Sequence, residues 1–473
     1  MGNSPYIVSI HILDNYSLLN IFYLYRPFFL GEDKNDYEHL IGGRGTWDLG
    51  RWWYRLAHVC QGWRNLILGS ASYLGLSLIC TTGTPVENML AHSPPLPLTV
   101  DYRSGDGITA EDDEGILFAL KQRHRVRHLH LVFPVQNLRK LVMAIDEEFQ
   151  DRPILEYLIV EPWTKNSAVL MLPETLQAPI LRHLLLGGFA CPIQPRLHPA
   201  AASLVTLYLI IDHPSAYFLP NMLLQWISFM PQLESLAIVF IFPVPNRDVE
   251  RQLTHTSIMT HVTLPSLRLF WFHGVSAYLE AVVCRIMTPC LEKLQIGLFN
   301  QLAFSVPHLV HFIMDTTENL RFDNAAIMFK DKYIDVVMFF READTYAVGV
   351  AVDCWHPDWQ VSSVAQICNA LSQVFSAVEH LSLEHQVHSQ SSEEHNNVDR
   401  IEWRNLLRSF SNVKTLRVED GLIEELSRCL RLEGGELPLE LLPELQELTY
   451  VESRDTGDAF TSFIDTGRTQ AAL

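Results

Sequence analysis

The chain has 473 residues, 48% of them hydrophobic and 19% charged, which supplies enough apolar side chains for a buried core and excludes a disordered chain. This length suits two or three domains, or one small domain joined to a repeat array. The formal net charge of -19 opposes sequence-independent binding to phosphate backbones, so no nucleic-acid partner is expected.

The eight cysteines are scattered along the chain without a Cys-x-x-Cys pair, and most lie among apolar residues. Because this pattern is typical of reduced, buried thiols, we expect a cytoplasmic or nuclear protein. The first residues lack the basic start and the small-residue cleavage site of a signal peptide. No apolar run reaches the roughly 18 residues that a membrane-spanning helix needs, so no membrane partner is expected.

Two apolar segments near the N-terminus are predicted to be helical, with a polar, glycine-containing loop over 26–50 between them. The first is a short helix whose apolar patch consists of Leu18, Leu19, Ile21 and Phe22. In the second, over 52–79, five apolar side chains recur at helical spacing and are expected on one face: Leu56, Val59, Cys60, Trp63 and Leu66. Gly69 then predicts the end of this helix.

After these helices a motif recurs with the pattern Pro-x-Leu-x-x-Leu-x-Leu. The copies with proline lie at 153–160, 179–186, 231–238, 265–272, 289–296, 307–314 and 443–450. Copies without proline lie at Val126/Leu129/Leu131, Leu204/Leu207/Leu209, Val378/Leu381/Leu383 and Val413/Leu416/Val418. Alternation of the apolar positions predicts a short strand in each copy, with proline at the strand entry, where no ladder N–H is lost.

Segments with helical spacing separate these strands, at 138–149, 221–230, 277–287, 364–375 and 401–410. Three pairs of residues fit a capping box and predict helix starts: Thr109 with Asp112, Ser363 with Gln366, and Asp399 with Glu402. Strands and helices that alternate with a period of 18 to 35 residues indicate stacked βα units. We therefore predict an α/β fold with a solenoid of such units.

The array is expected to be irregular for two reasons. Leucine-rich repeats usually place Asn or Cys three positions after the last strand leucine, and these positions hold other residues here, among them Trp163, Phe189, Ile241, Phe299 and Thr317. In addition, the repeat is interrupted near 320–360 by alternating apolar stretches that predict a hairpin of two or three strands.

Motifs of catalysis and of phosphate binding are missing: there is no Walker loop, Gly-x-Ser-x-Gly elbow or His-Glu-x-x-His. Four histidines near Glu393 and Glu394 could suggest a metal site, namely His380, His385, His388 and His395. Their surroundings are polar and low in complexity, which favours a solvated loop. We expect neither an enzyme nor a bound cofactor or metal.

The residues SLLNIF (17–22) and LAHVCQGWRNLI (56–67) are similar to the two halves of the F-box pattern. The spacing of Val59-Cys60 and Trp63-Arg64 is the most specific element of this similarity. The run CTTGTPVENMLAHSPPLPLTVDY (80–102) also looks typical of F-box-like proteins with irregular leucine-rich repeats, which are abundant in mushroom-forming (basidiomycete) fungi. The resemblance covers essentially the whole chain.

This resemblance implies an F-box-like helical module over 1–95 and an irregular leucine-rich-repeat-type array over 96–473. It further implies that the module docks on the adaptor subunit of an SCF-type ubiquitin ligase while the array captures a protein substrate. The adaptor-binding residues that carry over are Leu18, Leu19, Ile21, Phe22, Leu56, Val59, Cys60, Trp63 and Leu66.

Two alternatives stay open from the sequence. A small helical module needs much of its apolar surface for its own core, so each of these nine side chains is as well placed inside the module as against an adaptor. The helices could also only cap the open end of a repeat scaffold that has no link to ubiquitin.

Overall fold

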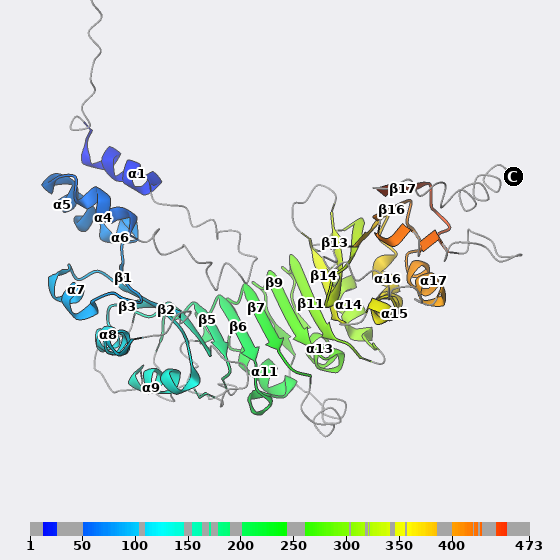
Figure 1. Ribbon diagram of the computed structural model, residues 1–473, viewed down its shortest axis with the longest axis horizontal. Helices are drawn as coiled ribbons and strands as arrows, with labels where there is room; N and C mark the ends of the chain where they lie inside the picture. Colours follow the sequence, from blue (N-terminus) through cyan, green and yellow to red (C-terminus); the bar gives the residue numbers. More distant parts are fainter. Residues whose placement is uncertain are drawn as a thin grey trace, which may run out of the picture. The chain divides into compact units, whose positions relative to one another are not determined.

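The computed structural model (Figure 1) describes residues 13–25, 51–103, 109–145, 154–162, 170–171, 178–189, 201–243, 261–301, 304–316, 320, 322–340, 346–354, 357–385, 400–419, 421–423, 426–427 and 441–451. The chain forms two compact units. The first consists of residues 1–187 and 194–203, and the second of residues 188–193 and 204–473. A division of the chain at residue 95 stays a prediction.

The first unit begins with helices and continues with alternating strands and helices. Its helices are α1 (Asn15–Tyr25), α4 (Trp52–Ala57), α5 (Gln61–Gly69), α6 (Ala71–Leu74), α7 (Val86–His92), α8 (Ala110–Lys121) and α9 (Val135–Ile145). Its strands are β1 (Leu78–Cys80), β2 (Leu98–Arg103), β3 (Val126–Phe133), β4 (Tyr157–Pro162) and β5 (His183–Gly187). These strands pair in chain order, and every pair is parallel.

The second unit has the same alternation. Its strands are β6 (Thr206–Ile211), β7 (Ser235–Phe240), β8 (Val262–Thr263), β9 (Leu269–Gly274), β10 (Ile286–Met287), β11 (Lys293–Phe299), β12 (Asn324–Phe329), β13 (Tyr333–Phe339), β14 (Val348–Asp353), β15 (His380–His385), β16 (Thr415–Glu419) and β17 (Glu447–Val451). Its helical elements are η3 (Pro214–Ala216), α11 (Pro220–Ile227), α13 (Ser276–Val283), α14 (Pro307–Asp315), α15 (Pro357–Ala370), α16 (Ser372–Phe375) and α17 (Arg400–Arg408). The predicted α/β class, with mostly parallel strands and βα units, is confirmed.

The second unit differs from a simple repeat in the middle of its sheet. The strand order is β6-β7-β9-β11-β14-β13-β12-β15-β16-β17. β13 runs antiparallel to both β12 and β14, whereas β14 lies parallel to β11 and β12 lies parallel to β15. The alternating stretches near 320–360 are therefore a three-stranded meander set into a parallel sheet. In the sheet the three strands lie in the order β14-β13-β12, the reverse of their order along the chain. The connection from β11 to β12 and that from β14 to β15 therefore each pass over two strands of the meander.

Ten of the eleven predicted strand motifs contain a strand, but the proline lies four residues before the strand and not at its entry. Pro179, Pro231 and Pro265 each follow the first residue of a tight turn. Each turn is closed by a backbone hydrogen bond, for example from Leu181 N to Ala178 O at 3.0 Å and from Leu233 N to Met230 O at 3.2 Å. Proline is preferred at the second position of such turns because its φ is already correct. The motif therefore reads as a turn followed by a strand.

The residue between each turn and its strand shows a second regular feature, in its backbone hydrogen bonds and in its charge. The residue just before a strand accepts two backbone hydrogen bonds from the next strand unit along the sheet: Glu234 O accepts from Arg268 N at 2.8 Å and from Leu269 N at 3.0 Å. Charged side chains of alternating sign occupy these positions in three stretches: Glu156 and Arg182; Glu234, Arg268 and Glu292; Glu379 and Lys414. Arg127, the second residue of β3, continues the alternation of the first stretch. Neighbours pair at 2.9 Å (Arg127–Glu156), 3.6 Å (Arg268–Glu292) and 2.8 Å (Lys414–Glu379).

The motif copy at 307–314 is not a strand, so that prediction is wrong. The segment forms helix α14, which starts with Pro307 in its first turn and buries Leu309, Val310, Phe312 and Ile313 at helical spacing. The carboxylate of Glu280, on α13, accepts hydrogen bonds from His308 N at 2.9 Å and Leu309 N at 2.8 Å. Because these are the unpaired donors of the helix start, the cap of α14 comes from the preceding helix.

The helix predictions at 221–230 and 401–410 are confirmed with small shifts of the ends, and that at 138–149 is confirmed as far as Ile145. The prediction at 277–287 is confirmed as far as Val283 and is wrong at 286–287, which is strand β10. The segment 364–375 is helical, but it comprises the end of α15 and the separate helix α16. The capping box of Thr109 and Asp112 is also confirmed. Ser363 does not start a helix, because α15 already begins at Pro357, and its buried hydroxyl donates to Asn300 Oδ1 at 3.2 Å. Asp399 lies outside the described residues.

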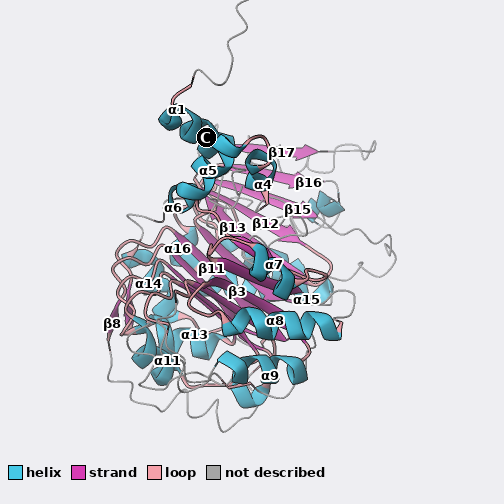
Figure 2. Cartoon of the chain, turned by 90° about the vertical axis from the view of Figure 1, so that its left-hand side faces the viewer, coloured by secondary structure: helices cyan, strands magenta, loops and turns pink. Residues whose placement is uncertain are grey.

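In the second unit the helices gather on one side of the sheet (Figures 1 and 2). Strand side chains that point to the helices form the core: the ring of Phe272 stacks on Tyr278 of α13 at 5.8 Å, and that of Phe329 lies 5.5 Å from Trp403 of α17. Trp403 and Phe272 are fully buried. Side chains at the alternate positions of these strands point away from the helices, and we call this side the second face.

Candidate functional site

The helical segment with the nine predicted adaptor-binding residues folds as three short helices packed on α1. Leu18 and Phe22 of α1 are buried, at 7% and 1% exposed, and the ring of Phe22 meets that of Trp63 edge to face at 4.8 Å. Leu19, Leu56, Cys60, Trp63 and Leu66 are half-buried. Only Ile21 and Val59 are exposed, at 43% and 59%. The nine residues therefore comprise two buried, five half-buried and two exposed side chains.

The expected single helical face from Leu56 to Leu66 is wrong. α4 ends at Ala57, and Cys60 has an extended backbone, with φ -158° and ψ 166°. Its Sγ accepts a hydrogen bond from Trp63 N at 3.4 Å and so caps α5. Cysteine is an unusual cap, because Ser, Thr, Asp and Asn dominate this position, and the sequence therefore gave no sign of a break. The interruption places Val59 in an exposed turn.

Sequence reasoning missed most of the exposed apolar side chains of this segment. Besides Ile21 and Val59, the exposed ones are Tyr16, Tyr23, Leu24, Tyr25 and Tyr73. The same segment has exposed arginines at 51, 55 and 64, whereas Asp14 is the only acidic residue of 13–25 and 51–76. Tyrosine and arginine are enriched at the centres of protein interfaces. We call the seven exposed side chains the apolar patch.

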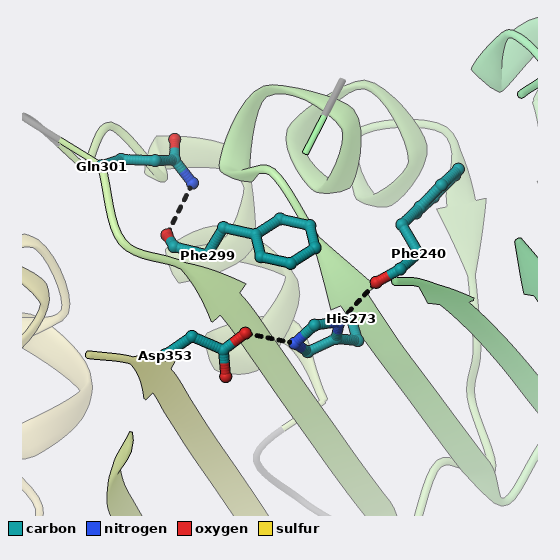
Figure 3. A network of polar contacts seen from close by, with 5 residues as sticks. All are labelled: Phe240, His273, Phe299, Gln301 and Asp353. Atoms are coloured by element: carbon teal, nitrogen blue, oxygen red, sulfur yellow. Dashed lines mark hydrogen bonds and ion pairs between the residues drawn. The ribbon is translucent and has the colours of Figure 1, made fainter. Parts of the chain in front are cut away.

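The second face carries a polar network around His273 of β9 (Figure 3). Nδ1 of His273 lies 2.7 Å from Phe240 O, and its Nε2 lies 3.1 Å from Oδ2 of Asp353 on β14. The ring lies over β11, where a Cβ on Gly297 would overlap it, and its edge meets Phe299 at 4.8 Å. A residue without a side chain at 297 thus lets one histidine connect three strands.

The partners of His273 determine its charge. A carbonyl oxygen and a carboxylate can only accept hydrogen bonds, so both ring nitrogens donate. Burial lowers the pKa of His273, but the hydrogen bond and the charge of Asp353, with the Phe240 carbonyl, outweigh it and raise the pKa above its ordinary value. These two contacts therefore favour the charged form of the imidazole over the neutral form.

A pH-dependent contribution to stability follows from this raised pKa. The contribution is fully present below the unfolded pKa of about 6.5 and is lost as the pH rises through the higher folded pKa. We expect His273→Gln to destabilise the chain most at pH 6 and progressively less as the pH is raised. Denaturant midpoints of both proteins over a pH series measure this, and a pH-independent difference would contradict it.

A second charged pair lies next to this network. Nζ of Lys330 contacts Oδ2 of Asp335 at 2.7 Å and lies 4.9 Å from the ring centre of Tyr333. Burial raises the pKa of Asp335, and the nearby Asp353 adds to this, while Lys330 opposes it. Tyr333 is 37% exposed, and Arg417 of β16 is exposed on the same face. The second face thus presents charged and aromatic side chains together.

His130 of the first unit differs from His273 in the direction in which its surroundings shift the pKa. His130 Nδ1 lies 3.1 Å from Asp101 Oδ1, and both side chains are buried. Burial lowers the pKa of His130 to about 3 and raises that of Asp101 to about 6, so at neutral pH a neutral imidazole faces a carboxylate. This contact is a buried hydrogen bond and not an ion pair.

The histidines considered for a metal site do not converge. His380 and His385 lie at opposite ends of β15, where His380 Nδ1 contacts Thr415 Oγ1 at 2.6 Å. His388, His395, Glu393 and Glu394 lie outside the described residues. In the part of the chain that the structure describes, no group of three His, Cys, Asp or Glu side chains could hold a metal ion. Within the same residues, no helix combines the length and the apolar character required to cross a bilayer.

Comparisons with known proteins give little beyond this geometry. No family model matches the chain, and no curated protein matches it. Among solved structures, the chain is similar to the leucine-rich repeat-containing protein LegL7 from Legionella pneumophila, with 11% sequence identity and a TM-score of 0.26 over 84% of this chain and 99% of that one. A likeness of this degree carries no argument, so the βα-repeat architecture rests on the strand pairing alone.

Proposed function

We propose that the chain is a non-enzymatic protein-interaction scaffold of the leucine-rich-repeat type, which binds a protein partner on the second face of its second unit. The observation that carries the proposal is the division of this sheet into two sides. Helices gather on one side (Figure 2), while Tyr333, Asp335, Asp353 and Arg417 occupy strand positions that alternate with the buried core residues and so belong to the other side. An array of this kind offers an extended surface of strands for recognition.

The chemistry of this surface supports protein binding more than binding of a small molecule. Half-buried Trp271, Gln295 and Val337 lie on β9, β11 and β13 of this face, and the exposed Tyr333 and Arg417 lie on β13 and β16. Interfaces combine aromatic anchors with a polar, charged surround in this way. The side chains are also fixed, since His273 and Lys330 hold the two aspartates, so little ordering is needed on binding.

The test is affinity capture from the cells that produce the protein, with quantitative mass spectrometry. Tyr333→Asp/Arg417→Glu changes the second face and is expected to lose a partner that the wild-type chain retains. Phe229→Asp/Arg408→Glu is the matched control on the helices, because Phe229 is 39% exposed and Arg408 is exposed. If both variants retain or lose the same proteins, the second face is not the binding surface.

A second, finer proposal concerns the helical segment, which we infer to be an F-box-like module that docks on the adaptor of an SCF-type ubiquitin ligase. It rests on the resemblance at 17–22 and 56–67, and it is supported by the apolar patch. A segment of basic and aromatic character in a chain of net charge -19 suits an acidic partner. The scaffold would then serve as a substrate receptor.

The competing role for these helices is to cap the repeats. The packing of Phe22 on Trp63 serves both roles, because it only builds the core of the segment. The exposed Ile21, Leu24 and Val59 serve docking and are not needed for a cap. Adaptor binding that depends on these exposed positions therefore distinguishes the two roles.

A further inference from the structure

Helices α7 and α8 of the first unit enclose a groove of about 510 Å³ that the proposed function does not use. The helices are in close contact where Gly115 faces Val86, because a Cβ on Gly115 would lie 3.1 Å from Val86 Cγ2. Asp112, which is 3% exposed, ties the groove end together: its Oδ1 accepts from Gly83 N at 2.8 Å, and its Oδ2 accepts from Thr109 Oγ1 at 2.8 Å. The groove walls are therefore fixed by hydrogen bonds.

The lining of the groove contains both apolar and acidic side chains. Val86, Leu117 and Phe118 supply apolar surface, and Leu117 is 37% exposed. Glu87 of α7 and Glu111 and Glu114 of α8 also line the groove, and Lys121 is the single Lys or Arg among the lining residues. The lining therefore combines apolar surface with an excess of negative charge.

The three glutamates are available for a ligand. All three are exposed, and among the described residues none of them has a hydrogen-bond or ion-pair partner. Asp112 is not available, because both of its carboxylate oxygens already accept hydrogen bonds, from Gly83 N and from Thr109 Oγ1. These bonds outweigh the effect of burial and lower the pKa of Asp112. Apolar side chains and carboxylates in one groove match the two parts of a lysine or arginine side chain, which buries its methylene stem and keeps its charged head near water and carboxylates.

We propose that this groove binds a protein segment that inserts one lysine or arginine, flanked by apolar residues, between α7 and α8. The stem of the basic side chain packs on Val86, Leu117 and Phe118, and its head meets the carboxylates of Glu111 and Glu114. The net charge of -19 raises the local concentration of such a cationic segment. The groove shares no residue with the apolar patch or with the second face, so its test is independent of theirs.

The test measures binding of a fluorescent heptapeptide, with one arginine between two leucines, to the full chain by fluorescence anisotropy. The same peptide with norleucine in place of arginine keeps the stem, lacks the charge and is expected to bind about fivefold or more weakly. Glu111→Gln/Glu114→Gln is expected to weaken the arginine peptide by a similar factor, because each surface ion pair contributes modestly. Leu117→Ala is expected to weaken both peptides.

Glu444→Gln/Glu447→Gln is the matched control, since it removes two exposed carboxylates outside the groove and is expected to leave binding unchanged. Equal losses in both glutamine pairs would show general attraction to the acidic chain and overturn the proposal. Absence of binding would also overturn it. So would displacement by spermine with no preference for the leucine flanks, because the groove would then be a polyamine site.

Discussion

Trp403→Ala is expected to lower the free energy of unfolding of the second unit by about 3–5 kcal/mol, the usual range for deletion of a fully buried large side chain. Trp403 lies in α17 and is 0% exposed, and its ring lies 5.5 Å from Phe329 of β12. Its removal leaves a cavity between α17 and the sheet. Urea unfolding followed by far-UV circular dichroism measures the loss.

Trp359→Ala is the control for this prediction. Trp359 lies in α15 and is 59% exposed, so the same substitution is expected to change stability by no more than about 0.5 kcal/mol. Trp403→Phe retains much of the apolar volume and should fall between the two. Equal losses for Trp403→Ala and Trp359→Ala would mean that α17 does not pack on the sheet as described.

Ile21→Asp/Val59→Asp is expected to weaken binding to an SCF adaptor subunit by about 100-fold or more, if the helical segment docks as proposed. Both side chains belong to the apolar patch, and substitutions at the centre of an interface often cost 2 kcal/mol or more each. Biolayer interferometry with the purified adaptor measures the change. Circular dichroism checks that both proteins are folded.

Ile180→Asp/Ile401→Asp matches this variant closely, because Ile180 is 43% and Ile401 60% exposed, against 43% for Ile21 and 59% for Val59. The control should bind the adaptor like wild type. If the wild-type chain does not bind the adaptor, or if both pairs bind equally, the helices do not dock and the capping role is favoured. Phe22→Ala is no substitute, because loss of this buried side chain would unfold the segment.

Much of the fold could be predicted because its signals are local. A proline turn followed by alternating leucines specifies each turn and strand within eight residues, and the helices between them show their own periodicity. The copy at 307–314 failed because Leu309, Val310, Phe312 and Ile313 satisfy the helical period while Leu309, Phe312 and Met314 satisfy the motif. Its neighbour Glu280, which caps the helix, is 27 residues earlier and could not be recognised locally.

The candidate site was predictable only in part. The core pair Phe22 and Trp63 and the exposed Ile21 and Val59 all lie at positions identified from the sequence, but their division into core and surface depends on the break at Cys60. The network on the second face could not be predicted. His273 and Asp353 are 80 residues apart, and they meet only because the order of the β12–β14 meander places β14 beside β11.

The alternating charges before the strands have a consequence for how such a chain can grow by gene duplication. Copying or deleting one unit in the stretch Glu234, Arg268 and Glu292 would place like charges side by side, whereas copying two units preserves the alternation. Each ion pair is worth at most about 1 kcal/mol, so a mistake would not prevent folding. It would instead lower the stability of the array slightly each time an odd number of units is copied or deleted. At Asp323 and Glu379, which precede the neighbouring strands β12 and β15, two like charges do adjoin, so the alternation is broken where the meander meets β15.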